Sequence, residues 1–364
     1  MYGKYSMGKF TSGKNVLFFL CIALVLASCA GSPSSRDNAS APLWVTDKDK
    51  AYPNSEWLCV VEQETDAKIA ERAAISRLAQ VFRVDLNSVT SANRQLVEAI
   101  GSVKKKTYVA GVQSTSVSQD LVAASAVSGL IGLQVESWTN PRDGRAYANA
   151  RMNRKECSAR YSAMIRENEK VIQSLKDEAD QNPATFEAYE LLNLAHAVAL
   201  VTDNYHSLLT VLDTSAISKQ PSYGNAEAVK SLARIAGQAI VVTVKVTGDI
   251  DGRIAKAYAE CFNSRGFRTN TGGANSYLLQ ASFSLEDADL PNEFNYKYVW
   301  YVLNYSLMNR AGVEVLSSSE NGREGHITQA TARQRTIRAA EDTITNPEKK
   351  GFAANFDAFL ASLL

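Results

Sequence analysis

The sequence predicts an α+β fold, in which two α+β domains with mostly antiparallel sheets and helices on one face are joined by a helical segment. Two patterns predict this class. Several segments alternate apolar and polar residues, which is typical of strands that bury one face. Other, longer segments repeat apolar residues every three or four positions, which is typical of amphipathic helices.

The first α+β domain is expected over residues 43–165. Residues 56–62 (EWLCVVE) are apolar and rich in strand-forming types, so they predict a strand. Thr65 can cap a helix that runs to about Arg83. Along this helix small or apolar residues recur every four positions, at Ala70, Ala74, Leu78 and Phe82.

A β-hairpin is expected later in the same domain. Residues 133–139 and 145–152 both alternate, and Asn-Pro-Arg-Asp-Gly at 140–144 separates them with turn-forming types. A helix is expected to begin near Arg154.

Residues 166–237 are expected to form a helical hairpin or linker. The segment Asp180–Pro183 interrupts the helical pattern, and Pro183 suits the start of a new helix. Tyr189, His196 and Leu200 then lie near one helix face.

The last α+β domain is expected over residues 238–364. Alternation predicts strands at 240–246, 277–285, 299–307 and 313–319. A glycine-bounded loop at 248–252 opens a helix, and two more helices are expected at about 328–344 and 352–364. This order of elements favours helices on one face of a mostly antiparallel sheet.

The first residues of the chain have the pattern of a signal peptide. Three lysines precede an apolar run at 16–26, which is shorter than the roughly 20 residues of a membrane-spanning helix. Leu26-Ala27-Ser28-Cys29 resembles the site at which bacterial lipoproteins are cleaved and lipidated. We therefore expect a signal peptide at 1–28, acylation of Cys29 and a flexible tether over 29–42. The alternative is an ordinary secretory signal with a chance cysteine.

Cleavage of the signal peptide would remove Cys21 and acylation would use Cys29, so three of the five cysteines remain. An exported protein meets an oxidising compartment, and Cys59 and Cys157 fall in the same predicted domain, so they are the candidate disulfide. The alternative is that these two and Cys261 are buried apolar residues.

The first domain resembles a known family. Pro42-Leu43-Trp44-Val45, the alanine-rich helix at 67–79 and the hairpin segments Val135–Trp138 and Tyr147–Met152 are similar to the Lpp family of twenty-kilodalton surface lipoproteins and to the amino-terminal domain of FlgT. The last domain is more weakly similar to the amino-terminal domain of TolB, through its element order and Leu307–Val313. The resemblance implies an envelope protein that works by contact, and it carries over no catalytic residues.

Residue patterns typical of enzymes are missing from the sequence. His196 and His206 are ten positions apart, which does not suit a helical metal pair, and no phosphate-binding glycine loop or nucleophile elbow occurs. We therefore expect no enzymatic activity, no cofactor and no metal. The 39 basic residues nearly balance the 38 acidic ones, which argues against nucleic acid as a partner.

One candidate interaction surface remains. Tyr296, Tyr298 and Trp300 share one strand face if that strand begins early enough, whereas Val299 and Tyr301 share the other. One face must cover the core, so the first three aromatics are candidates for a partner surface. The alternative is that packing buries both faces.

These features together predict a lipid-anchored protein of the bacterial cell envelope. We expect a scaffold or assembly factor that faces the periplasm and binds an envelope protein. Ala30 replaces the aspartate that favours inner-membrane retention, so the outer membrane is favoured over the inner. The alternative is a periplasmic module that binds a small ligand or a glycan.

Overall fold

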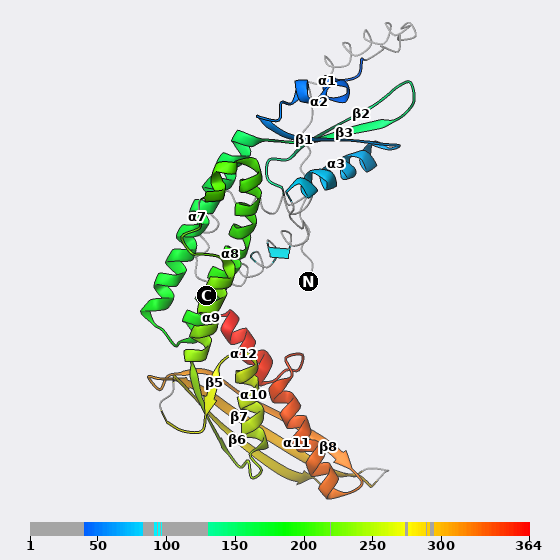
Figure 1. The fold of residues 1–364 in the computed structure, drawn as a ribbon. Coiled ribbons are helices and arrows are strands. Elements are labelled where there is room, and N and C mark those ends of the chain that lie inside the picture. Colours follow the sequence, from blue (N-terminus) through cyan, green and yellow to red (C-terminus); the bar gives the residue numbers. More distant parts are fainter. Residues whose placement is uncertain are drawn as a thin grey trace, which may run out of the picture. The chain divides into compact units, whose positions relative to one another are not determined.

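The fold is α+β, as the sequence predicts, with helices and two mostly antiparallel sheets (Figure 1). The computed structural model describes residues 40–82, 91, 92, 94, 96, 130–218, 220–273, 276–288, 290, 291 and 295–364. The predicted signal peptide, Cys29 and all of the tether except residues 40–42 lie outside the described residues.

The smaller sheet has three antiparallel strands in the order β1 (Trp57–Glu64), β3 (Ala146–Asn153), β2 (Gln134–Thr139). Helix α3 (Ala67–Val81) packs on one face of this sheet. Asp66, rather than the predicted Thr65, caps α3 by accepting hydrogen bonds from two backbone N–H groups of its first turn. Alanines on both sides allow the close approach, because Ala70 and Ala74 of the helix and alternate alanines of β3 are fully or almost fully buried.

The opposite face of the smaller sheet carries a polar cluster. It includes Tyr52, which follows the short helices α1 (Leu43–Thr46) and α2 (Lys48–Ala51). The Glu136 carboxylate accepts hydrogen bonds from Tyr52 (2.8 Å) and Asn149 (3.0 Å) and pairs with Arg151. The Arg151 guanidinium also lies 4.5 Å from the Tyr52 ring centroid. Burial, followed by the hydrogen bond to Glu136, raises the pKa of Tyr52 to about 12.

The cysteines differ from the predicted disulfide, because Cys59, Cys157 and Cys261 are all free and buried. Cys59 lies on the polar face, where its thiol donates to Asn149 Oδ1 at 2.8 Å. Cys157 belongs to the core cluster on the other face, together with the strand neighbour Leu58. Adjacent strand residues point to opposite faces, so the sheet itself separates the two thiols.

A group of helices continues the core of the smaller sheet. It consists of α7 (Arg154–Gln181), α8 (Phe186–Leu212), the short 3-10 helix η1 (Thr214–Ser218) and α9 (Ala226–Ala239). Helices α7 and α8 form the expected hairpin, and one continuous apolar cluster runs from the smaller sheet to α9. Contacts place Leu43–Leu364 in one compact unit, and the predicted divisions at 165 and 237 stay predictions.

The larger sheet has five strands, in the order β5 (Arg268–Asn270), β4 (Val241–Thr247), β6 (Tyr277–Ala288), β7 (Lys297–Asn309), β8 (Glu314–His326). Strand β4 is parallel to β5 and β6, and the other pairs are antiparallel. Helices α10 (Arg253–Ser264), α11 (Gln329–Thr345) and α12 (Phe352–Ala361) lie on one face, which we call the inner face (Figure 1).

Phe186, the first residue of α8, joins the helical group to this second core. Its fully buried ring stacks on Tyr277, with 4.0 Å between centroids, and meets Phe267 and Phe356 edge-on at 5.0 and 5.2 Å. The Phe186 backbone N–H donates to the Tyr277 hydroxyl at 3.1 Å. The start of α8 is therefore fixed by residues that follow it by about 80 to 170 positions in the sequence.

Candidate functional site

The candidate site is the outer face of the larger sheet, opposite α10, α11 and α12. Alternation places Val299, Tyr301 and Leu303 of β7 in the inner core. The intervening β7 side chains, including Tyr298 and Trp300, therefore point to the outer face. The residues that pair with them on β8 point the same way, because directly opposed residues share a face.

Two predicted aromatics lie together at one end of this outer face. The Arg323 guanidinium carbon on β8 is 5.5 Å from the ring centroid of Tyr298 and 5.4 Å from that of Trp300. These distances are within the range of cation–π attraction. We call Tyr298, Trp300 and Arg323 the aromatic cluster.

Gly325 explains how the Tyr298 ring can lie across β8. A Cβ at Gly325 would meet the Tyr298 ring at 2.5 Å, so only glycine leaves room for it. Because Gly325 has no side chain, the Tyr298 ring can pack directly on the backbone of β8. The same relation holds on the inner face, where Gly322 faces the Tyr301 ring.

Tyr296 is placed differently from Tyr298 and Trp300. It precedes the first residue of β7, Lys297, so strand alternation does not fix its direction. Its ring meets Tyr298 edge-on, with centroids 6.5 Å apart, and 38% of Tyr296 is exposed. Tyr296 therefore extends the aromatic cluster from outside the strand.

Arg323 did not come from the sequence reasoning, because the predicted strand ended at residue 319. The Asn309–Gly312 turn predicts that a second strand runs back along β7, but it does not predict the register. An irregularity between Leu307 and Met308 shifts the pairing by one residue, and only this shift brings Arg323 rather than Gly322 opposite Trp300. The polar sequence of β8 conceals the strand, because none of the residues of β8 is fully buried.

A shallow hollow of ≈ 520 Å³ lies on the same face, along β4, β6, β7 and β8. Most of the residues that line it carry polar side chains, namely Lys245, Thr247, Gln280, Ser282, Asn304, Ser306, Glu314 and Ser317.

Hydrogen bonds hold the polar side chains of this hollow in place. The Asn304 amide donates to Ser282 Oγ at 3.2 Å. Ser306 and Ser317 donate to the two oxygens of Glu314 at 2.5 and 2.6 Å. These two hydrogen bonds, Ser306 first, lower the pKa of Glu314. The hollow thus offers ordered amides, hydroxyls and one carboxylate.

Two other kinds of site are absent from the described part of the chain. No group of three or more His, Cys, Asp or Glu side chains there could hold a metal ion. None of the helices in those residues is long and apolar enough to cross a membrane.

Comparisons with known proteins identify structural likenesses but no family. No protein-family profile matches the chain, so the resemblances to Lpp, FlgT and TolB stay predictions, and no curated protein matches it either. A minor lipoprotein of Acinetobacter baumannii is similar over 32% of this chain and 92% of its own, with 9% identity and a TM-score of 0.27. A secreted protein of Helicobacter pylori is similar over 85% of this chain and 98% of its own, with 14% identity and a TM-score of 0.39.

Proposed function

We propose that this protein is a lipid-anchored, non-enzymatic scaffold or assembly factor of the bacterial cell envelope, which binds a partner protein through the outer face of the larger sheet. The aromatic cluster supports this proposal most directly. Tryptophan, tyrosine and arginine are the residue types that most often dominate binding energy at protein interfaces. Here one of each lies on a sheet face opposite the three helices that cover the core.

The mechanism of such a surface is contact rather than chemistry. The backbone at Gly325 and the Arg323 guanidinium restrict the Tyr298 ring before a partner binds. Side chains that are already ordered lose less conformational entropy on binding. The hydroxyls and amides of the neighbouring hollow then supply directional hydrogen bonds.

Cross-linking in cells tests this surface. A photo-reactive residue at the exposed Ser284, on the outer face of β6, should form a covalent adduct with one defined partner. We expect Trp300→Ala and Arg323→Ala to abolish this adduct. Trp138→Ala removes a similarly half-buried tryptophan on the smaller sheet, whose ring lies tilted against that of Tyr147, and should leave the adduct unchanged. An adduct that survives Trp300→Ala in a folded protein would refute the surface assignment.

A small-ligand or glycan-binding module is the second candidate function. The polar hollow on the same face favours it, since ordered amides and hydroxyls match the hydroxyl groups of a sugar. A thermal-shift screen of soluble peptidoglycan fragments and oligosaccharides distinguishes the two functions. A true ligand raises the melting temperature with concentration, by mass action.

The membrane attachment in this proposal depends on Cys29 and favours the outer membrane. Labelled palmitate should be incorporated into the wild-type protein and not into Cys29→Ala. Fractionation of the two membranes then tests the location. Equal labelling of both proteins would contradict the anchor, and turnover of an envelope substrate by the purified protein would contradict the non-enzymatic role.

A further inference from the structure

A second hollow, unrelated to the outer face, lies between α8, α9 and the turn that follows α10. Its volume is ≈ 620 Å³, within the range of small-molecule sites. Tyr189 of α8 and Gly237 of α9 both line it. Tyr189 lies one helical turn after Phe186, so the hollow begins close to the contacts that Phe186 makes with the second core. Gly237 allows the close approach, because a Cβ there would lie 3.2 Å from the Tyr189 ring.

Most of the residues that line this hollow carry a side-chain hydrogen-bond donor. Lys230, Arg234 and Gln238 follow one another at four-residue intervals along α9, which places them on one side of the helix. Ser231 of α9 and Asn193 of α8 add a hydroxyl and an amide.

The one acidic residue of the described lining pairs with only one of these cations. Glu227 is the one carboxylate that the described lining contains, and it lies 3.7 Å from Lys230. Both side chains of this pair are largely exposed, so the pair contributes little and Lys230 can turn toward a ligand. Arg234 has no carboxylate within ion-pairing distance among the residues that the structure describes.

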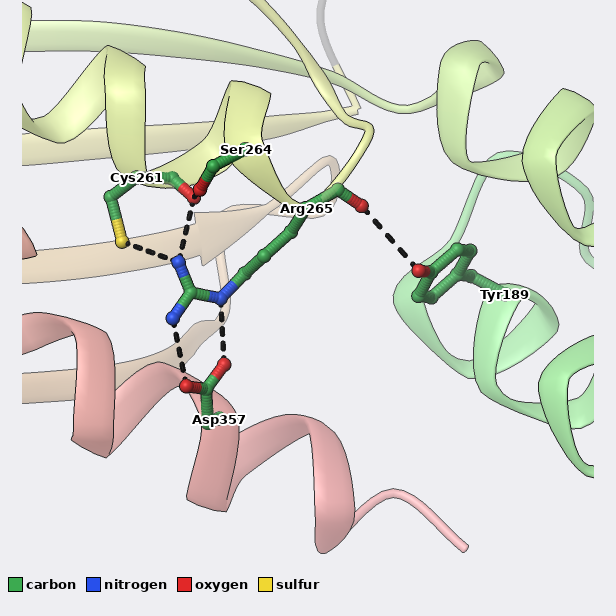
Figure 2. A network of polar contacts seen from close by, with 5 residues as sticks. All are labelled: Tyr189, Cys261, Ser264, Arg265 and Asp357. Carbon is green, nitrogen blue, oxygen red and sulfur yellow. Dashed lines mark hydrogen bonds and ion pairs between the residues drawn. The ribbon is translucent and has the colours of Figure 1, made fainter. Parts of the chain in front are cut away.

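Arg265 also lines the hollow, but its positive charge is paired with a carboxylate and does not face the hollow. Figure 2 shows its guanidinium directed at Asp357 of α12, with two hydrogen bonds of 2.6 and 2.7 Å. The same group donates to the Cys261 carbonyl at 2.8 Å. Its backbone carbonyl is what faces α8, where it accepts a long hydrogen bond of 3.4 Å from the Tyr189 hydroxyl (Figure 2).

We propose that this hollow binds a small soluble molecule that carries a phosphate monoester, with Arg234 and Lys230 on the phosphate. A phosphate monoester is close to a dianion at neutral pH, which two cations offset. The planar guanidinium of arginine matches two phosphate oxygens at once, and the lysine adds a point charge. Ser231 and the amides of Asn193 and Gln238 supply neutral donors, and the Tyr189 ring forms an apolar wall for the rest of the molecule.

Calorimetric titration of the mature full-length chain tests the site, with glycerol phosphate as the probe and sodium chloride at matched ionic strength as the reference. We expect saturable binding to the wild type. Loss of a charged hydrogen-bonding partner in Arg234→Gln should weaken it by about tenfold or more. Lys256→Gln, which removes a comparably exposed lysine on α10, should bind as the wild type does.

Hydrogen exchange locates the bound probe independently of affinity. Binding should slow exchange in α9 and in the turn at residues 265–266 while leaving the smaller sheet unchanged. Circular dichroism first verifies that each variant is folded. The proposal is overturned by the absence of saturable heat with the wild type, by equal affinity in Arg234→Gln, or by protection elsewhere.

Discussion

Phe186→Ala tests whether the first residue of α8 holds two cores together. The wild-type ring is fully buried and contacts Tyr277, Phe267, Phe356 and, at 6.0 Å, Phe359. Truncation of a buried phenylalanine to alanine costs about 3–5 kcal/mol, because transfer energy is lost and a cavity remains. The dense ring packing leaves little freedom to collapse into the cavity, so we expect the upper half of this range.

Urea denaturation followed by tryptophan fluorescence measures this cost. The control is Ile235→Ala on α9, which truncates a side chain that is 58% exposed and should change stability by less than about 0.5 kcal/mol. Hydrogen exchange should also speed up at the start of α8 and in α12 together, since one ring contacts both. If Phe186→Ala lowered the free energy of unfolding no more than Ile235→Ala does, the claim that Phe186 holds the two cores together would be refuted.

Three further predictions concern charge and packing. Burial raises the pKa of Glu190 to about 7 from an ordinary 4.5, so the folded protein binds more protons than the unfolded chain between these values. Stability should therefore fall by about 1–3 kcal/mol as the pH rises from 4.5 to 7, and Glu190→Gln should remove that slope in urea titrations at pH 5 and pH 8. Arg151→Ala leaves the partly buried Glu136 without its cation and should cost about 2–4 kcal/mol, measured by chemical denaturation. Gly322→Ala forces a Cβ to within 2.5 Å of a tyrosine ring and should cost about 1–3 kcal/mol, whereas Gly272→Ala, with open space around it, should be nearly neutral in the same thermal melts.

The sequence predicted the elements of the larger sheet well, because its pattern is strong. Strict alternation marked β6 and β7, and the glycine-bounded loop placed the start of α10 at Arg253. β5 escaped prediction, since three residues are too few for any period to appear. Half of β8, from residue 320 on, escaped as well, because residues 320–325 (ENGREG) contain no large apolar side chain on either face.

The candidate sites could be predicted only in part. Tyr298 and Trp300 are visible in the alternation of a single strand, but Arg323 becomes their neighbour only through the register between two strands. The hollow beside α9 also needs Tyr189 and Asn193 of α8 and residues 265–266, each more than 20 positions from the α9 residues that line it. Local periodicity contains no information about such distant packing.

The free thiols have a consequence for redox chemistry. Desolvation is the largest influence on Cys59, Cys157 and Cys261, and it raises the pKa of each to about 11. At pH 7 roughly one thiol in ten thousand is then ionised, and only the thiolate reacts readily. In the oxidising compartment that the proposed location implies, folding would thus protect these cysteines from mispairing. A thiol-reactive dye would label the protein only as fast as it opens, which makes the three cysteines internal reporters of unfolding.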